Sequence, residues 1–269
     1  AIYAESTFAE SQRLLAFAPD VSTKYTRRGP AEYLRIAQYI QVAVEGKEGN
    51  YMVFFPSYKM MQDVYEVFRD IAEGENPADS AEEVQDREDG KDGKEGKNSK
   101  DGRYGRDEKN QILEICMQTS NMQEQEREQF LQMFEQEREG SLVAFCVMGG
   151  IFSEGIDLKN DKLIGAIIVG TGLPQISNER QILKDYYDER GLSGFDYAFR
   201  YPGINKVLQA AGRVIRTQED RGIILLLDER FLQADYAPLF PREWKERKVC
   251  NLKQIKEEVK RFWKEVEQE

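Results

Sequence analysis

Two arginines stand out in a stretch of sequence where polar and apolar residues alternate with helical spacing. The stretch reads KVLQAAGRVIRTQEDRG, residues 206–222. At 3.6 residues per turn, one face of the expected helix carries Gln209, Gly212, Arg213 and Arg216, and the opposite face is apolar. Guanidinium groups bind phosphate oxygens through paired hydrogen bonds, so this polar face predicts contact with an anionic group from elsewhere.

A solvated helix face is the alternative for these arginines. Arg216 lies three or four residues before Glu219 and Asp220, whereas Arg213 has no acidic residue at that spacing. Arginine side chains also lie over apolar surface while their charge stays in water. The stretch by itself leaves both interpretations open.

A second candidate is the segment PSYK, which follows the apolar run NYMVFF. Pro56 ends the expected strand, and Ser57 stands where it can cap the next helix. A hydroxyl, free backbone amides and the positive end of a helix together form a phosphate seat. Serine at such a position is also an ordinary helix cap, and the segment alone does not decide between the two.

A third candidate is the segment MGGIFSEGIDL. Gly149 and Gly150 permit close approach of the backbone to a ligand, and Glu154 with Asp157 adds two carboxylates in the following turn. A glycine turn followed by the acidic start of a helix is the alternative. The GTGLP loop, residues 170–174, is a weaker signal and predicts a turn rather than a nucleotide site.

The composition excludes several kinds of chemistry. The chain of 269 residues contains no histidine, which removes imidazole bases, Ser–His triads and His-ligated metals from this chain. Cys116, Cys146 and Cys250 are too widely separated for a metal knuckle, so we expect reduced, structural thiols in the cytoplasm. The net charge of −11 argues against a broad nucleic-acid surface but not against a small local patch.

The ends and the hydropathy of the chain add three expectations. The chain does not begin with Met, and we expect it to be part of a longer protein. No window of the sequence approaches a membrane span or a signal peptide, so we expect a globular protein without membrane contact. We expect it to be a monomer.

The elements that must position these residues alternate between strand and helix. Short apolar runs predict buried parallel strands at residues 50–55, 141–147, 163–170 and 222–228. Amphipathic patterns predict helices at residues 33–44, 58–71, 124–139 and 252–266, besides the arginine-bearing helix. Strands separated by helices indicate an α/β fold with a doubly wound, mainly parallel sheet flanked by helices.

One segment departs from this pattern. Gly74–Asn110 is rich in charged residues and glycine, and acidic residues outnumber basic ones. Its apolar content is too low for it to order itself, which predicts a disordered-type, charged, low-complexity insertion within one domain. A partner-binding tail is the alternative, but folded patterns resume on both sides of the segment.

Three of these stretches, in this order, resemble motifs IV, V and VI of the DinG/XPD-like helicases of superfamily 2. They read NYMVFFPSY, GGIFSEGIDL and QAAGRVIR, and the last two are highly specific together. The resemblance runs from about Val21 to about Glu243, the insertion excepted, and it is to the C-terminal of two RecA-like motor domains. We therefore expect residues 1–269 to form one such domain.

The resemblance implies roles for individual residues. Arg213 and Arg216 match arginines that reach across the cleft between the motor domains to the phosphates of ATP, with Gln209 and Gly212 beside them. Motif V lies at the same cleft and couples nucleotide state to the nucleic-acid track. The residues that match its cleft positions are Glu154, Gly155 and Asp157. The residues assigned to the nucleic acid are Ser57 and Tyr58 of motif IV and Ser153 of motif V.

The resemblance also implies what this chain lacks. The sequence contains no GKT-type phosphate loop and no DEAH-type box, which in that family belong to the N-terminal motor domain. ATP and Mg²⁺ are therefore expected to bind mainly in that domain, and any iron–sulfur cluster would lie there too. The implied partners are the N-terminal motor domain of the same protein and single-stranded DNA, along which the family moves 5′ to 3′.

Two other classes of function stay open from the sequence. One is a noncatalytic RecA-like module that binds nucleic acid or protein and has lost its coupling to ATP. The arginines and the motif V carboxylates speak against it. The other is a related superfamily 2 enzyme acting on RNA, because tracking along a backbone is independent of sequence and does not distinguish the two nucleic acids.

Overall fold

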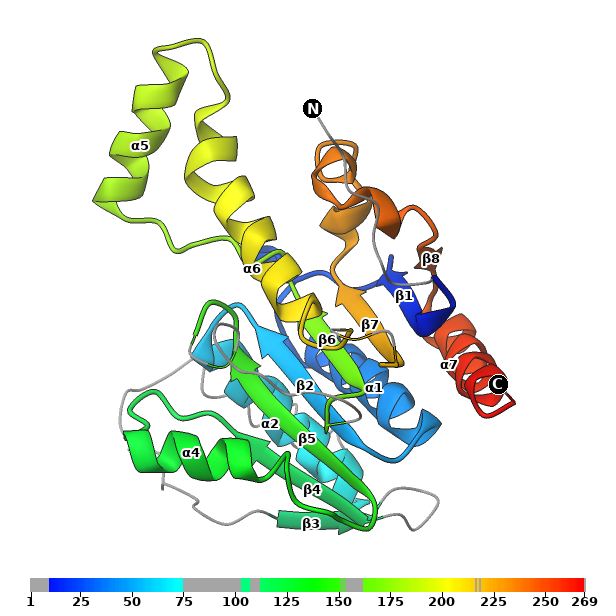
Figure 1. The fold of residues 1–269 in the computed structure, drawn as a ribbon. Coiled ribbons are helices and arrows are strands. Elements are labelled where there is room, and N and C mark those ends of the chain that lie inside the picture. Colours follow the sequence, from blue (N-terminus) through cyan, green and yellow to red (C-terminus); the bar gives the residue numbers. More distant parts are fainter. Residues whose placement is uncertain are drawn as a thin grey trace.

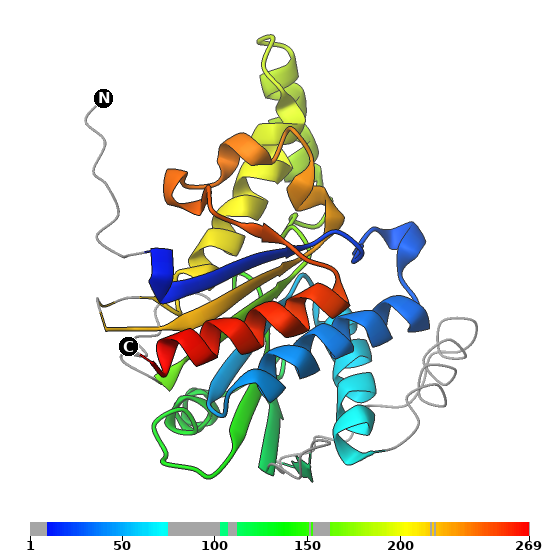
Figure 2. The same ribbon diagram turned by 90° about the vertical axis from the view of Figure 1, so that its right-hand side faces the viewer.

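A single sheet runs through the molecule and helices cover both of its faces (Figures 1 and 2). The computed structural model describes residues 10–74, 103–106, 112–150, 152, 162–215, 217 and 219–268. In this part of the chain the strands are β1 (Arg13–Ala18), β2 (Asn50–Phe55), β3 (Arg103–Arg106), β4 (Ile112–Met117), β5 (Ser141–Val147), β6 (Gly165–Val169), β7 (Gly222–Leu227) and β8 (Lys248–Val249).

The strand order is β3-β4-β5-β2-β6-β7-β1-β8. Every neighbouring pair is parallel except β3 and β4, which run antiparallel. The order reverses direction in the middle of the sheet, beside β2, because chain segments cross over on both sides of it. The predicted doubly wound, mainly parallel α/β fold is confirmed.

Six α-helices of the described chain form the outer layers. They are α1 (Pro30–Gly46), α2 (Tyr58–Glu73), α4 (Glu124–Gln132), α5 (Asn178–Asp188), α6 (Tyr201–Ala211) and α7 (Leu252–Val266). Helices α1, α2 and α7 pack on one face of the sheet, and α4 and α6 pack on the other. Helix α5 buries no residue, and with the start of α6 it projects away from the sheet (Figure 1).

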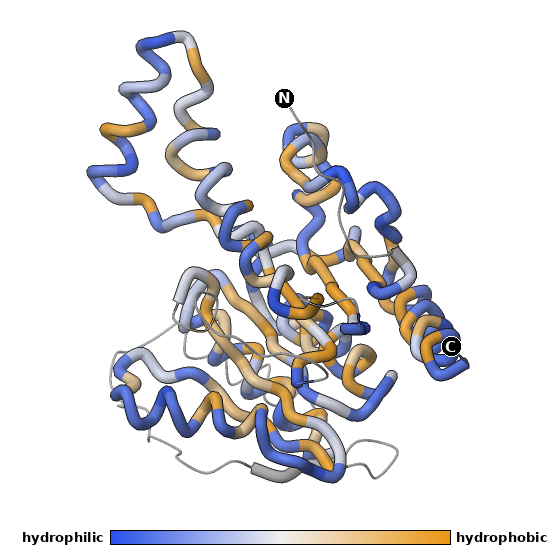
Figure 3. Tube along the Cα trace, in the orientation of Figure 1, coloured by the Kyte–Doolittle hydropathy of each residue, from blue (hydrophilic) through white to orange (hydrophobic). Residues whose placement is uncertain are grey.

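The strands are apolar on both sides because both faces of the sheet are covered. Along β2, Tyr51, Val53 and Phe55 point into the layer with α1 and α2, whereas Met52 and Phe54 point into the other layer. A strand that is buried on both faces gains stability from every side chain and does not need a polar alternation. Figure 3 shows this concentration of hydrophobic residues in the strands.

Several predicted elements have the expected bounds. The strands at residues 50–55 and 141–147 and the helix at residues 252–266 agree residue for residue with β2, β5 and α7. The start of α2 is fixed by Ser57, whose side chain accepts a hydrogen bond from the backbone N of Met60 at 3.4 Å. Its end is fixed by Gly74, which has φ +73° and closes the helix in the left-handed conformation.

Other elements differ from the prediction. Helix α4 ends at Gln132 and not at residue 139, and the Arg138 guanidinium donates to the Met133 carbonyl just beyond its end. Strands β1 and β4 were not predicted. Strand β3 lies inside the predicted insertion, so Arg103–Arg106 is ordered by pairing with β4, although its own apolar content is low. Residues 75–102 lie outside the described part of the chain.

Candidate functional site

The carboxyl ends of the parallel strands gather two of the predicted segments at one edge of the sheet, here called the carboxyl edge. Ser57 and Tyr58 directly follow β2, and Gly149 and Gly150 follow its neighbour β5. In doubly wound sheets, ligands bind at this edge beside the point where the strand order reverses. The structure therefore brings the motif IV segment and the start of the motif V segment together.

Gln118, which sequence reasoning missed, joins these two segments. It follows β4 and is 4% exposed. Its Nε2 lies 3.0 Å from the Tyr58 hydroxyl, and its Oε1 accepts a hydrogen bond from the Val147 backbone N at 3.0 Å. A Cβ on Gly150 would lie 3.2 Å from the Val147 carbonyl oxygen and 3.3 Å from Gln118 Nε2, so a larger residue there would crowd this network. A lone glutamine after an unpredicted strand gave no signal in the sequence.

Two cations flank this network. The charge of Arg127 in α4 lies close enough to Tyr58 to act on its pKa, although burial outweighs it and raises that pKa overall. On the other side, a Cβ on Gly149 would lie 2.8 Å from Cε and 3.2 Å from Nζ of Lys206 in α6. The two cations and the polar groups between them form an arc along the carboxyl edge, here called the carboxyl-edge arc. Its members are Arg127, Tyr58, Gln118, Gly149, Gly150 and Lys206.

The charge of the arc differs from that of the molecule. In the described part of the chain no carboxylate lies within ion-pair distance of Lys206, and Arg127 pairs with the exposed Glu124 at 3.3 Å. The Nε of Arg127 is buried without a hydrogen-bond partner among the described residues. The arc thus gathers hydrogen-bond donors and two cations on a chain of net charge −11, and Glu124, Glu126 and Glu128 lie beside Arg127 in α4.

Two glycines allow helix α6 to pack closely against the GTGLP loop, residues 170–174. Gly172 in the GTGLP loop has φ +67°, and a Cβ there would lie 2.7 Å from the carbonyl oxygen of Gly203. A Cβ on Gly203 would lie 2.7 Å from the carbonyl oxygen of Thr171. The loop therefore forms a close packing contact for α6.

The arginine-bearing segment is not helical throughout. Helix α6 ends at Ala211, and Gly212, Arg213 and Val214 form a turn. The predicted apolar face holds as far as Ala211, but the prediction that Arg213 and Arg216 continue the helix was wrong for Arg213. The chain turns there because Val214 packs in the core, where a Cβ on Gly222 would lie 2.2 Å from its Cγ1.

This turn places Arg213 at the opposite edge of the sheet, here called the amino edge, because Gly222 begins β7. Arg213 is half-buried, and Gln209 and Gly212 are exposed. The six residues of β7 separate the two edges by roughly 20 Å at about 3.3 Å per residue. Arg213 and Tyr58 therefore lie at opposite edges of the sheet.

The turn at residues 212–214 is here called the arginine turn. Asp220, which is 3% exposed, holds the segment between this turn and the start of β7. Its carboxylate accepts hydrogen bonds from the Thr217 backbone N at 2.7 Å and from the Thr217 hydroxyl at 2.9 Å. Gln12, ahead of β1, donates to the Asp220 carbonyl at 3.2 Å. Asp220 thus fixes the backbone on which the arginine turn is mounted.

The described residues on either side of the rest of the motif V segment lie at different edges of the sheet. Gly150 lies at the carboxyl edge, whereas the carbonyl of Lys162 accepts from the side chain of Asn50 at the amino end of β2, at 2.9 Å. The carbonyl of Ile164 lies next to Gly222, beside the arginine turn. Five predicted site residues lie outside the described part of the chain: Ser153, Glu154, Gly155, Asp157 and Arg216.

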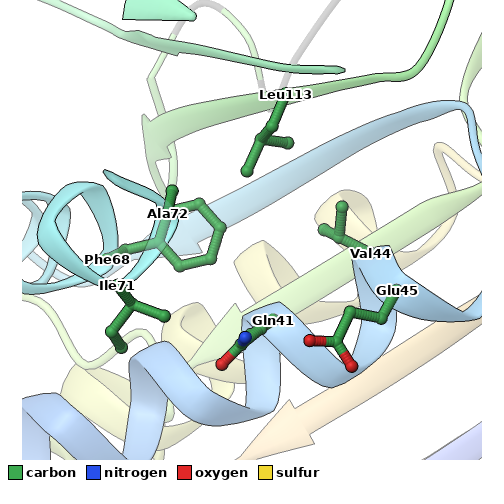
Figure 4. Close-up of a pocket in the computed structure, with 7 residues that line it drawn as sticks. All are labelled: Gln41, Val44, Glu45, Phe68, Ile71, Ala72 and Leu113. Atoms are coloured by element: carbon green, nitrogen blue, oxygen red, sulfur yellow. The ribbon is translucent and has the colours of Figure 1, made fainter. Parts of the chain in front are cut away.

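A small apolar pocket between α1, α2 and β4 contains none of the predicted site residues (Figure 4). Its one acidic lining residue, Glu45, is paired with Lys256 of α7 at 3.6 Å. Among the described residues, no three His, Cys, Asp or Glu side chains are grouped as a metal site. None of the described helices is long and apolar enough to span a membrane.

The three cysteines are free. Cys146 and Cys250 are buried, and Cys116 is partly covered beside Cys146 on the neighbouring strand. Burial raises the pKa of each thiol. Thiols with raised pKa values are poor nucleophiles and poor metal ligands at neutral pH, which fits the structural role predicted for them.

Comparison with known proteins shows the family. Residues 40–247 match the model of the helicase C-terminal domain. A regulator of telomere elongation helicase 1 homolog from Caenorhabditis briggsae is 26% identical over 225 residues, which is 80% of this chain and 20% of that protein. A probable ATP-dependent helicase from Methanocaldococcus jannaschii is 31% identical over 103 residues, or 35% of this chain and 16% of that protein.

Solved structures show the same fold. A structure of apo XPD superposes with a TM-score of 0.57 at 18% identity, covering 89% of this chain and 40% of that one. A structure of XPD helicase gives a TM-score of 0.56 at 19% identity, covering 88% and 35%. The chain thus spans a fifth or less of these two curated relatives and less than half of these structures. The family match over residues 40–247 shows that the chain belongs to the helicase C-terminal domain family, and the solved XPD structures share its fold.

Proposed function

We propose that this chain is the C-terminal motor half of an ATP-dependent DNA helicase that moves 5′ to 3′ along single-stranded DNA. The observation that carries the proposal is the division of the candidate residues between two edges of one sheet. A motor that couples ATP hydrolysis to movement needs a nucleotide half-site and a nucleic-acid half-site on one rigid body. The sheet supplies that rigidity.

The amino edge is the proposed nucleotide half-site. Arg213 and Arg216 would contact the phosphates of ATP bound by the N-terminal motor domain of the same protein, with Gln209 and Gly212 beside them. Guanidinium groups stabilise the charge that develops on the γ-phosphate as it leaves. Mg²⁺, which neutralises phosphate charge, would bind mainly in the N-terminal domain. An iron–sulfur cluster, where the whole protein has one, would lie there too.

The carboxyl edge is the proposed nucleic-acid half-site. Ser57, Tyr58 and Ser153 are assigned to the DNA strand by the motif pattern, and Arg127 and Lys206 add positive charge beside Tyr58. Contacts of this kind bind the sugar–phosphate backbone without reading its sequence. The negative charge of the rest of the chain would confine the strand to this edge.

The motif V segment is proposed to couple the two half-sites. Its described start, Gly149, lies at the carboxyl edge, and Lys162, which follows the segment, lies at the amino edge. Glu154, Gly155 and Asp157 lie between these two residues in sequence. A nucleotide-dependent shift at the amino edge would then be transmitted to the DNA. We place this motor in the cytoplasm as a monomer.

The nucleotide half-site is tested by Arg213→Lys in the complete helicase that contains this chain. Lysine keeps the charge but loses the paired hydrogen bonds, so DNA-stimulated ATP turnover should fall roughly 10³-fold, with far less change in ATP affinity. Arg261→Lys on the exposed surface of α7 is the matched control and should turn over ATP as the wild type does. Near-normal turnover of the Arg213 variant would contradict the proposed role.

A further inference from the structure

The Tyr58 hydroxyl at the carboxyl edge is held in one hydrogen-bonding direction by a buried side chain. Strand β4 pairs with β5 only as far as Met117 and Phe145, where the Gln118 backbone N donates to the Phe145 carbonyl at 2.8 Å. Two residues on, the Val147 N–H faces the same side but has passed the end of β4. There the Gln118 side chain serves as the hydrogen-bond partner that a longer β4 would supply. Its oxygen lies 3.0 Å from the Val147 nitrogen.

This contact determines which way the amide points. A backbone N–H can only donate, so the Gln118 atom that faces Val147 is the carbonyl oxygen. The amide NH₂ group is therefore directed at Tyr58, 3.0 Å away. An NH₂ group can only donate as well, so the Tyr58 oxygen accepts this bond. The proton of the Tyr58 hydroxyl is consequently left to point away from Gln118.

The surroundings of Tyr58 favour an anion as the acceptor of that proton. Tyr58 is half-buried, and burial raises the pKa of its hydroxyl, which keeps the proton in place at neutral pH. The charge of Arg127 acts on Tyr58, and Lys206 lies against Gly149 in the loop after the neighbouring strand β5. A neutral donor near a cation is suited to an oxygen of a phosphate.

We propose that Gln118 is a positioning residue that fixes the Tyr58 hydroxyl as a hydrogen-bond donor to a backbone phosphate of single-stranded DNA. The inference rests on the proposed nucleic-acid half-site. It adds a residue that does not itself touch the strand but decides whether Tyr58 offers a proton or a lone pair to it.

The test measures the affinity of the protein for a fluorescent thymidine oligonucleotide at low salt, in the wild type and five variants. In Gln118→Glu, a carboxylate still accepts from Val147 but also accepts from Tyr58, which turns the hydroxyl proton inward. We expect about tenfold weaker binding, the effect of losing one hydrogen bond to a charged group. Tyr58→Phe should weaken binding by about the same factor, without changing its salt dependence, because no charge is removed.

The double variant distinguishes positioning from other effects. Gln118→Glu combined with Tyr58→Phe should bind no more weakly than either single variant, because both remove the same donor. A carboxylate that merely repelled DNA would weaken binding in both backgrounds, and that additive result would overturn the proposal. Tyr51→Phe is the matched control: its buried hydroxyl donates to the Lys47 carbonyl at 2.6 Å, at the amino end of β2, and its loss should leave binding unchanged.

Lys206→Ala separates a failure of this inference from a failure of the half-site. If the wild type binds and Lys206→Ala weakens binding and its salt dependence, the half-site stands. Wild-type affinity in Gln118→Glu and Tyr58→Phe would then overturn the inference alone. No binding by the wild type at low salt would overturn both. Melting temperatures of all variants within a few degrees of the wild type show that the fold is retained.

Discussion

Asp228 is fully buried at the carboxyl end of β7, and it keeps its charge because its partners surround it. Its carboxylate accepts from the Thr23 backbone N at 3.0 Å, from the Thr23 hydroxyl at 2.6 Å, and from Nε and Nη2 of Arg230, both at 2.8 Å. Burial acts to raise the pKa of Asp228, but the hydrogen bonds and the charge of Arg230 outweigh it and lower the pKa. Asp228 therefore links the segment that follows β1 to the segment that follows β7.

Replacing Asp228 should destabilise the protein in a pH-dependent way. Asp228→Ala leaves Arg230, whose side chain is 17% exposed, without its carboxylate, and should lower the free energy of unfolding at pH 7 by about 3 kcal/mol. The folded-state pKa is below the unfolded value of about 3.9, so the stabilisation is present above about pH 4 and is lost as pH falls through the folded pKa. Urea denaturation of both proteins from pH 7 to pH 3 measures it.

The matched control is Asp185→Ala on the exposed face of α5, which should leave the denaturation midpoint unchanged. A stability difference between the wild type and Asp228→Ala that did not shrink below about pH 4 would contradict this account of Asp228.

At the scale of elements, the seating of α6 decides where the arginine turn lies. The helix touches the GTGLP loop at Gly203, near its start, and ends at Ala211, before Gly212, where the chain turns toward β7. Both positions are glycine, but only the first is confined by backbone atoms of another element.

Gly203→Ala should be clearly destabilising, whereas Gly212→Ala should not. A Cβ on Gly203 would lie 2.7 Å from the Thr171 carbonyl oxygen and 3.2 Å from the Gly172 carbonyl carbon, and backbone atoms cannot yield as a flexible side chain can. We expect a loss of about 1–3 kcal/mol, as for overpacking. Gly212 has φ −67°, which any residue adopts, and alanine there should change stability by less than about 1 kcal/mol. Thermal melting of the two variants compares them, and equal melting temperatures would contradict the seating role of Gly203.

In the whole molecule, the charged insertion supplies the strand that covers one edge of the sheet. The insertion was predicted to be a solvated excursion, yet its last part forms β3 and covers the outer edge of β4. An uncovered edge strand offers unpaired backbone groups to other chains. Strand β3 also packs against α2, so both ends of residues 75–102 meet the folded body.

Replacing residues 75–102 with a short Gly–Ser linker should change the free energy of unfolding by less than about 1 kcal/mol, because the cost of closing a loop varies slowly with its length. Replacing residues 75–106 removes β3 as well, and should lower stability further and produce association that increases with protein concentration. Melting curves and light scattering at several concentrations measure both effects. Equal behaviour of the two trimmed proteins would show that β3 does not protect the edge.

Local patterns were sufficient for much of the fold. The continuous apolar runs of β2 and β5 and the amphipathic spacing of α7 predict those elements with their bounds, because each depends on residues within a few positions of one another. The same holds for the order of motifs that predicts the helicase family. Strands β1 and β4 were missed although their apolar content is similar, since the first precedes the motifs and the second follows a segment set aside as an insertion.

The tertiary structure alone decided how the candidate residues are distributed. Gln118 and Tyr58 are sixty positions apart in the sequence, and only the pairing of β4 with β5 and of β5 with β2 brings them together. Helix α6 stops at Ala211 because Val214 packs against Gly222, a contact that helical periodicity cannot express. The sequence alone specifies which positions hold a charged side chain, a hydroxyl group or a glycine. Their division between two edges of the sheet depends on packing between distant segments, and so it was decided only when the chain folded.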